Sequence, residues 1–330
     1  MRLDGPVDDI VSDATDQGSA VPSTVPPAVD EPGDPRRRRP WLLALVVALR
    51  PRQWLKNLLV YAAPLAAAEL LHRDVLIDTT VAFFCFCAAA SATYLINDVR
   101  DRDADRVHPR KRFRPIAAGE LSPTAAIVAA VVLVVLSLSV AALSTYPAFV
   151  VTLLCYLVMT AAYSLGLKNE PVIELAILAG GFVLRAIAGG TATGIPLSPW
   201  FLTVAAFGSL FVAAGKRYSE FVSLGPDERD ARPGLRHYSA TYLRFVWTVS
   251  AAVLLTAYCL WAFAIASRAR HSIPFAELSV VPFVLAVLRL GLDIDHGDAG
   301  EPEDVALRDR VLQVLALLWV VTFALGAAGV

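Results

Sequence analysis

Long apolar stretches constrain the fold of this chain more than any other feature of its sequence. Several of them approach or exceed the roughly 20 residues that a helix needs to cross a hydrocarbon layer. The composition agrees, because 56% of the 330 residues are hydrophobic and only 18% are charged, which is too little polar material to cover a soluble core of this size. The sequence therefore predicts an all-α, polytopic membrane protein. Its formal net charge of −1 gives no indication of a nucleic-acid partner.

The apolar stretches predict nine membrane-spanning helices. They cover residues 54–72, 75–97, 123–144, 146–166, 171–191, 198–217, 242–267, 278–292 and 307–329. The link from the third to the fourth runs only from Ser144 to Tyr146. So short a link predicts that these two helices form an antiparallel hairpin.

The first 40 residues differ from the rest of the chain. Residues 1–35 are rich in Asp, Pro, Ser and Thr, a composition typical of disorder, and no apolar stretch follows Met1 as it would in a signal peptide. The four arginines at 36–39 favour an anchor against anionic lipid headgroups over a nucleic-acid tail. Residues 1–40 are therefore predicted to be a disordered cytoplasmic tail, and residues 41–330 the membrane domain.

Lysine and arginine are distributed unevenly between the two sides that nine spans define. Sixteen lie in loops on one side, and three, Arg73, Arg268 and Arg270, lie on the other. Because basic residues are enriched in cytoplasmic loops, the larger loops and the N-terminus are predicted to be cytoplasmic. The expected location is the cell membrane. The oligomeric state, a homo-oligomer included, stays open.

An acidic motif closes the second predicted span. Its members are Asn97, Asp98, Asp101 and Asp105. If the helix continues through all of them, they fall within an arc of about 100°. Oxygen ligands gathered on one face repel each other unless a cation lies between them, and hard oxygen ligands beside phosphates favour Mg²⁺. The motif predicts a Mg²⁺ site, and the alternative is a solvated helix end made of Asp–Arg pairs.

Basic residues follow the acidic motif directly. Lys111, Arg112 and Arg114 lie within five residues of one another, and such cations beside a carboxylate-bound metal suit a polyphosphate. The enrichment of basic residues in cytoplasmic loops would also place them here. Lys216 and Arg217 repeat this pattern of paired cations at the end of the sixth predicted span.

A second basic element opens the first predicted span. Arg52 and Lys56 are four residues apart, so on an α-helix they share one face, with Asn57 close by. Contact with a substrate and contact with lipid headgroups would each explain this pair.

Two ionisable residues lie inside the fifth predicted span. Glu174 and Arg185 are functional candidates, because charge within a span is costly and usually faces a cavity. They share one helix face but lie about 16 Å apart, so they are not expected to pair. Arg185 could bond helix carbonyls or contact an acidic lipid. Tyr163 and Lys168 come just before this span, at its cytoplasmic side.

The pattern N-D-x-x-D-x-x-x-D at the end of the second helix resembles the first aspartate-rich motif of the UbiA superfamily of intramembrane prenyltransferases. The resemblance covers residues 45–330 and implies a bundle of nine helices with cytoplasmic polar loops. Residues 51–57, 97–115 and 163–185 are similar, more narrowly, to actinobacterial phosphoribosyltransferases of this superfamily. Those enzymes join 5-phosphoribose 1-diphosphate (PRPP) to decaprenyl phosphate and release diphosphate, and the product feeds arabinose donor synthesis for the cell wall.

This resemblance implies a Mg²⁺-dependent transfer of 5-phosphoribosyl to a polyprenyl phosphate. The implied metal ligands are Asn97, Asp98, Asp101 and Asp105, and the three aspartates are the implied catalytic residues. The implied substrate-binding residues are Arg52, Lys56, Asn57, Lys111, Arg112, Arg114, Tyr163, Lys168, Glu174, Arg185, Lys216 and Arg217.

The closest alternative is a UbiA prenyltransferase that alkylates an aromatic acceptor with a prenyl diphosphate, because the aspartate face serves both chemistries. Such enzymes carry a second aspartate-rich motif after the sixth helix, where this chain has Lys216 and Arg217 instead. Additional cations suit a donor that bears a 5-phosphate as well as a diphosphate. A third alternative is a transporter or lipid-binding protein that holds phosphates with the same basic residues. It is disfavoured, because no pair of Gly/Pro-broken helices occupies corresponding halves of the chain.

Overall fold

The computed structural model describes residues 39–225, 234–267, 273–300, 305 and 308–329. Helices joined by turns and loops make up these ranges, and they contain no strand, which confirms the predicted all-α class. The tail predicted for residues 1–40 lies outside the described residues up to residue 38.

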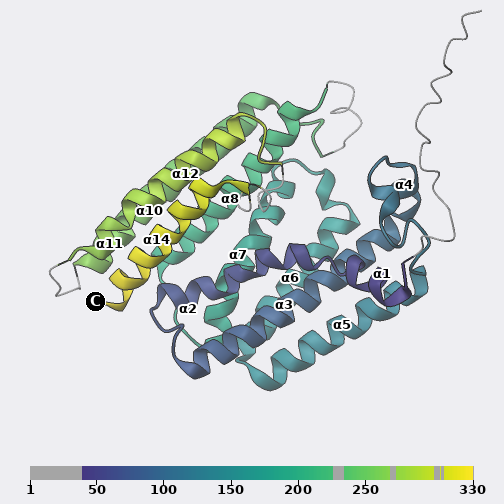
Figure 1. Cartoon of the computed structure of the whole chain (residues 1–330), viewed down its shortest axis with the longest axis horizontal. Coiled ribbons are helices and arrows are strands. Elements are labelled where there is room, and N and C mark those ends of the chain that lie inside the picture. Colours follow the sequence, from purple (N-terminus) through teal and green to yellow (C-terminus); the bar gives the residue numbers. More distant parts are fainter. Residues whose placement is uncertain (1–38, 226–233, 268–272, 301–304, 306–307, 330) are drawn as a thin grey trace, which may run out of the picture. The chain divides into compact units, whose positions relative to one another are not determined.

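Seven long α-helices and a helix pair form the membrane domain (Figure 1). The long helices are α3 (Arg73–Arg100), α5 (Pro123–Ser144), α6 (Pro147–Leu165), α7 (Ile173–Thr193), α8 (Pro199–Ser223), α10 (Ala240–Ala266) and α14 (Arg310–Ala328), and the pair is α11 (Phe275–Leu278) with α12 (Val280–Asp295). The shorter elements are α1 (Trp41–Ala48), the 3₁₀ helix η2 (Pro51–Tyr61), α2 (Ala62–Ala66), α4 (Arg102–Val107), η3 (Lys111–Phe113) and η4 (Leu167–Asn169).

The described residues contain eight helical segments long and apolar enough to cross a membrane, so the predicted count of nine is not confirmed. The segment that differs is the first predicted span. It is a 3₁₀ helix, η2, followed by the short helix α2. The larger rise of a 3₁₀ helix gives these sixteen residues a length of about 30 Å, close to the thickness of a hydrocarbon core.

Local sequence explains where several helices begin. Ser122 and Ser198 accept hydrogen bonds from backbone N–H groups in the first turns of α5 and α8, and a proline follows each serine. Ser239 caps α10 in the same way, and Asp309 accepts from two N–H groups of α14. These caps satisfy donors that the first helical turn leaves without partners.

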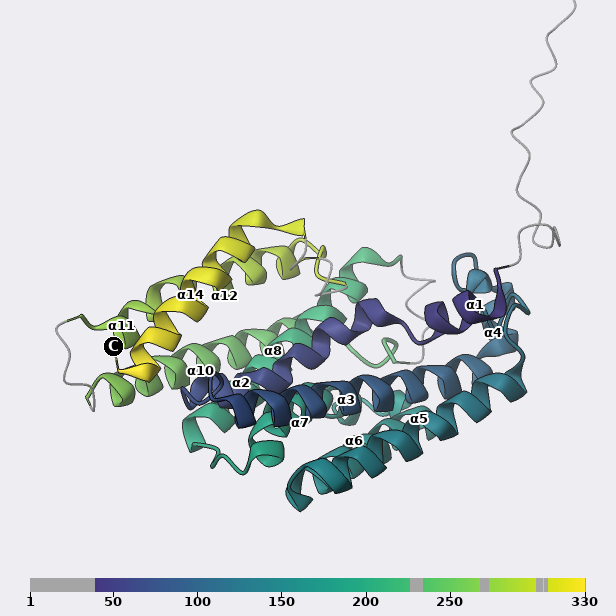
Figure 2. The ribbon, with the colours of Figure 1, turned by 60° about the horizontal axis from the view of Figure 1, so that its bottom comes forward.

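Long helices that follow one another along the chain pack antiparallel (Figures 1 and 2). The most extensive contacts join α8 to α10, α3 to α5, and α7 to both α6 and α8. Side-chain bonds link the C-terminal end of α3 to that of α6, the C-terminal end of α8 to the first turn of α7, and the first turns of α10 to the end of α12. We call this end of the helices the charged end.

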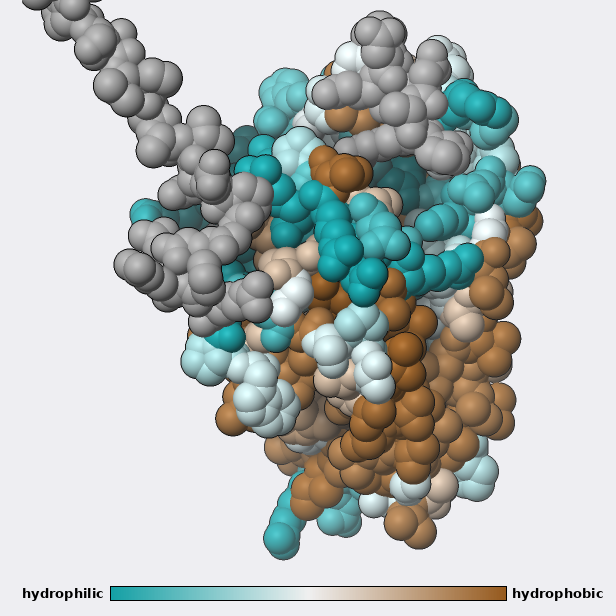
Figure 3. Space-filling model, turned by 90° about the vertical axis from the view of Figure 1, so that its right-hand side faces the viewer, coloured by the Kyte–Doolittle hydropathy of each residue, from teal (hydrophilic) through white to brown (hydrophobic). Residues whose placement is uncertain are grey.

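Apolar side chains cover the outside of the helices away from the charged end. On α5, for example, Val128, Val131 and Val135 are each more than half exposed. Figure 3 shows hydrophilic residues over the upper part of the view and a broad apolar surface below them. Exposed apolar area on this scale is stable only against lipid.

Candidate active site

Two buried carboxylates and two arginines form the centre of the charged end. The Arg114 Nη1 atom donates to Asp98 Oδ1 at 3.1 Å and to Asp105 Oδ2 at 2.7 Å. Arg50 donates to the same Asp98 oxygen at 2.5 Å. Each aspartate is 2% exposed. We call these four residues the Asp–Arg cluster; pairing offsets the cost of burying its charges.

The end of α3 explains how Asp98 and Asp105 come together. The helix is interrupted at Asp101, which ends α3 and begins α4, although backbone bonds still link residue 101 to 97 and residue 105 to 101. The helical path therefore nearly continues, as the motif predicts. Asp103, which lies between Asp101 and Asp105 in the sequence and is not part of the motif, is 81% exposed and contacts Arg102 and Arg106.

The residues of the Asp–Arg cluster fit a divalent cation. Asp98 and Asp105 converge on one cationic nitrogen, so one cation can contact both carboxylates. The other two predicted ligands have different surroundings. Asp101 is half-buried at the junction of α3 and α4, and Asn97 Oδ1 accepts a hydrogen bond of 2.6 Å from the Ser164 hydroxyl. In the described ranges, no three His, Cys, Asp or Glu side chains gather as a metal-binding group. Mg²⁺ commonly takes one or two carboxylates and completes its coordination with water and substrate phosphates.

The basic residues predicted to follow the acidic motif divide into two kinds. Arg114 belongs to the Asp–Arg cluster, whereas Lys111 is exposed on η3. Arg112 lies over the Phe113 ring at 4.9 Å, and its buried Nε has no hydrogen-bond partner among the described residues. An unsatisfied buried donor is costly, so Arg112 would gain a hydrogen bond if its side chain turned toward a phosphate.

A second charged group lies between the start of α7 and the end of α8. The Arg217 Nε donates to Glu174 Oε1 at 2.7 Å, and Arg217 also pairs with Glu220. Tyr163 lies beside this arginine, and Glu174 is 1% exposed. Arg217, predicted to clamp phosphate, is thus already neutralised by two carboxylates.

Tyr238, shortly before α10, lies beside this second group. Tyr238 accepts a hydrogen bond from the Val172 N–H at 2.8 Å and stacks on Tyr242 with ring centroids 5.9 Å apart. Burial raises the pKa of the Tyr238 hydroxyl, while the bond from Val172 acts in the opposite direction. The hydroxyl therefore stays protonated at neutral pH. Lys168, on η4, is half-buried and lies four residues before Val172 in the sequence.

Arg185 lies in the interior of the helices and bonds only to neutral groups in the described part of the chain. Its Nε donates to Asn57 Oδ1 at 2.7 Å, Nη1 to the Gly181 carbonyl at 2.7 Å, and Nη2 to the Tyr156 hydroxyl at 3.0 Å. Its guanidinium also lies over the Tyr156 ring at 4.8 Å. These contacts favour the helix-bonding role over the lipid contact. They also place Asn57, predicted near a substrate, against Arg185.

The pair Arg52 and Lys56 does not share a helix face as predicted. That expectation assumed an α-helix, but η2 has three residues per turn, which separates residues four apart by about 120°. Residues three apart are aligned instead, and the Lys56 ammonium accordingly donates to Gln53 Oε1 at 2.7 Å. Lys216 is half-buried near the end of α8.

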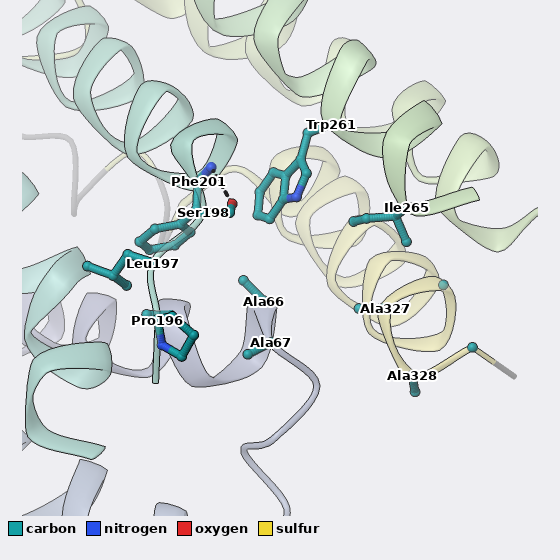
Figure 4. A pocket seen from close by; sticks show the side chains of 13 residues that line it. Ala66, Ala67, Pro196, Leu197, Ser198, Phe201, Trp261, Ile265, Ala327 and Ala328 are labelled. Carbon is teal, nitrogen blue, oxygen red and sulfur yellow. Dashed lines mark hydrogen bonds between the residues drawn. The ribbon is translucent and has the colours of Figure 1, made fainter. Parts of the chain in front are cut away.

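A cavity of about 330 Å³ lies at the opposite end of the helices from the Asp–Arg cluster. Figure 4 shows Trp261, Phe201 and Pro196 around it. None of its lining residues among the described ranges is charged.

Among the residues that sequence reasoning did not include in the site are Arg50 of the Asp–Arg cluster, and Glu220 and Tyr238 of the second charged group. Arg50 has a left-handed backbone, with φ of 54°, which is uncommon outside glycine and often marks a functional position. Its place directly before Pro51 gives no such signal, because a residue before proline usually takes an extended backbone. Glu220 lies three residues after Arg217, a spacing that aligns side chains on a helix. No local signal marks Tyr238.

Together these features define a polytopic, all-helical membrane protein with a buried acid–base site at one end of its helices. Residues 57–307 match the model of the UbiA prenyltransferase family. The chain belongs to this family.

Curated relatives and solved structures agree with this assignment. The chain is 51% identical to the decaprenyl-phosphate phosphoribosyltransferase of Mycobacterium tuberculosis, covering 86% of this chain and 93% of the relative. The enzyme of that name from Corynebacterium glutamicum is 48% identical, with 86% and 87% covered. A UbiA homologue from Archaeoglobus fulgidus bound to DMAPP and Mg²⁺ superposes with a TM-score of 0.63 at 20% identity, covering 87% of this chain and 98% of that one.

Proposed function

We propose that this protein transfers the 5-phosphoribosyl group of PRPP to a polyprenyl phosphate, decaprenyl phosphate in the first instance, and releases diphosphate. The observation that carries the proposal is the identity of about half the residues, over 86% of the chain, with relatives named for that activity. The lipid-linked product would supply arabinose donor synthesis for the cell wall. The basic residues set among the carboxylates of the charged end support the proposal.

In the proposed reaction the bond from ribose C1 to the diphosphate oxygen breaks, and an oxygen of the acceptor phosphate bonds to C1. Mg²⁺, when bound, would neutralise the charge that develops on the departing diphosphate. Asp98 and Asp105 would hold it, with Asn97 and Asp101 as further candidates from the same motif. Because the acceptor phosphate is already anionic near neutral pH, no strong general base is needed, and positioning and electrostatics dominate.

The cations of the charged end would bind the phosphates of PRPP. Arg112 has a buried donor without a partner in the described residues, and Lys111 lies exposed next to it. Binding of a phosphate at Arg114 would require it to exchange contact with Asp98 and Asp105. The further candidates for donor phosphates are Lys168, Lys216 and Arg217. Arg52 and Lys56 are candidates for contact with either the acceptor phosphate or lipid headgroups.

The test uses purified protein, Mg²⁺, radiolabelled PRPP and decaprenyl phosphate, with label counted in the organic phase. We expect lipid-linked label that disappears with EDTA and returns when Mg²⁺ is added in excess. Protein that is folded but transfers no label would contradict the proposal. Transfer from a prenyl diphosphate to an aromatic acid in the same preparation would then establish the alternative activity.

A further inference from the structure

An apolar groove of about 450 Å³ runs along the outside of α3, α5 and α6. This volume lies within the range of roughly 300–1,000 Å³ that is usual for ligand sites. Its apolar wall includes Ile96, Val134, Leu157 and Ala161. The groove extends from residue 92 to residue 100 on α3, about 12 Å of helix, which is somewhat less than half the hydrocarbon thickness.

Small side chains leave room in the groove, and its threonine hydroxyls bond to their own helices rather than facing an occupant. Ala92 and Ala130 line it, and a methyl side chain at each position takes up less of the hollow than any longer side chain would. The hydroxyls of Thr93 and Thr160 donate to carbonyls of their own helices, Ala90 at 2.7 Å and Tyr156 at 2.8 Å. Because these hydroxyl protons already have acceptors, an apolar ligand in the groove would leave no hydroxyl donor without a partner.

Polar residues close one end of the groove, and this end adjoins the candidate active site. Asn97, Arg100 and Ser164 line it there, with the Ser164 hydroxyl 2.6 Å from Asn97 Oδ1 and the Arg100 guanidinium bonded to the Ser164 carbonyl. Asn97 directly precedes Asp98 of the Asp–Arg cluster. Arg100 is exposed and brings a positive charge to the mouth of an otherwise apolar groove.

We propose that this groove binds the first isoprene units of the polyprenyl phosphate acceptor, with its phosphate at Arg100. The inference rests on the proposed function. One continuous apolar hollow that ends at a cation matches a single hydrocarbon chain carrying an anionic head, whereas a diacyl phospholipid would bring two chains. The remainder of the long chain would lie in the bilayer. Arg52 and Lys56 would then contact bulk lipid headgroups, the other interpretation of that pair.

Ala161→Phe tests the groove, because Ala161 is an exposed residue of its wall and a phenylalanine there can enter the hollow without disturbing a core. Val158→Phe is the matched control: it lies on the same helix, is 68% exposed and does not line the groove. We expect Ala161→Phe to raise the KM for decaprenyl phosphate about tenfold, with the KM for PRPP unchanged. Val158→Phe should behave as the wild type, and Arg100→Gln should raise the same KM.

A binding measurement without PRPP separates this inference from the proposed function. Photocrosslinking with a diazirine-bearing polyprenyl phosphate should label α5 and α6 peptides of the groove in the wild type and lose that label in Ala161→Phe. Equal labelling of Ala161→Phe and Val158→Phe would overturn the inference even if transfer is active. Competition offers a second check. If phosphatidylglycerol at an equal concentration abolished the labelling, the inference would also be overturned, because the groove would then be a general lipid site. Groove labelling in protein that transfers nothing would support the groove and contradict only the phosphoribosyl reaction.

Discussion

At the scale of single residues, the charged end depends on where two carboxylates point. Asp98 and Asp105 face Arg114, and Asp103, in the same stretch of sequence, faces solvent. We expect Asp98→Asn and Asp105→Asn each to lower transfer about a hundredfold or more, as loss of a group that stabilises transition-state charge usually does. Asp103→Asn should retain near wild-type activity. Initial rates with PRPP and decaprenyl phosphate measure this, and equal losses in all three variants would refute the assignment.

Arg185 offers a second residue-scale prediction. Because it bonds Asn57, Gly181 and Tyr156, replacing it leaves buried acceptors without donors, at about 1–3 kcal/mol for each. We expect Arg185→Met to lower the melting temperature in detergent by several degrees. The double variant Arg185→Met/Asn57→Leu should recover part of that loss, since it removes both partners. A raised KM with an unchanged melting temperature would instead assign Arg185 to substrate binding.

At the scale of elements, η2 and α7 approach too closely for any side chain at one position. A Cβ added to Gly189 would lie 2.0 Å from the Val60 carbonyl oxygen. We expect Gly189→Ala to push the two helices apart and to destabilise the protein by about 1–3 kcal/mol. Gly208→Ala is the control, because its Cβ would meet Leu254 at an ordinary 3.5 Å. Thermal unfolding of both variants measures this, and equal stability would show that η2 shifts freely.

The start of α14 carries a pH-dependent contact. The hydrogen bond from Arg289 at 2.6 Å, reinforced by the N–H groups of Val311 and Leu312, lowers the pKa of Asp309 from 3.8. A lowered pKa means that the contact stabilises the fold fully above pH 3.8 and less as pH falls through the folded value. Asp309→Asn keeps the cap but removes the charge. The melting-temperature difference from wild type should be present at pH 6 and shrink below pH 4; a constant difference would contradict this.

At the scale of the whole membrane domain, the charged end and the opposite end should lie on different sides of the bilayer. The proposed orientation places the charged end in the cytoplasm. A cysteine at Arg110, exposed beside η3, should therefore resist an impermeant maleimide in intact cells. A cysteine at Leu71, 92% exposed at the opposite end, should react. The wild type reports any reaction of the native cysteines, and the reverse labelling pattern would invert the orientation.

The sequence by itself determined the helical class, the position of most spans and the face on which Asp98 and Asp105 lie. These properties follow from residues near one another along the chain: apolar runs long enough to cross lipid, serines and prolines at helix starts, and carboxylates at helical spacing. The same local information also singled out Glu174 and Arg185, because a charge inside an apolar run is visible without any structure.

Only the tertiary structure decided which charged and polar side chains meet. Arg50 contacts Asp98 across 48 residues, and Arg185 contacts Asn57 across 128. Sequence patterns carry no information about such distances, since they depend on how helices pack. The 3₁₀ form of η2 and the groove beside Asn97 have the same origin. The structural roles of Gly189, Ala92 and Ala130 likewise depend on which helices lie next to them, and the sequence does not show this.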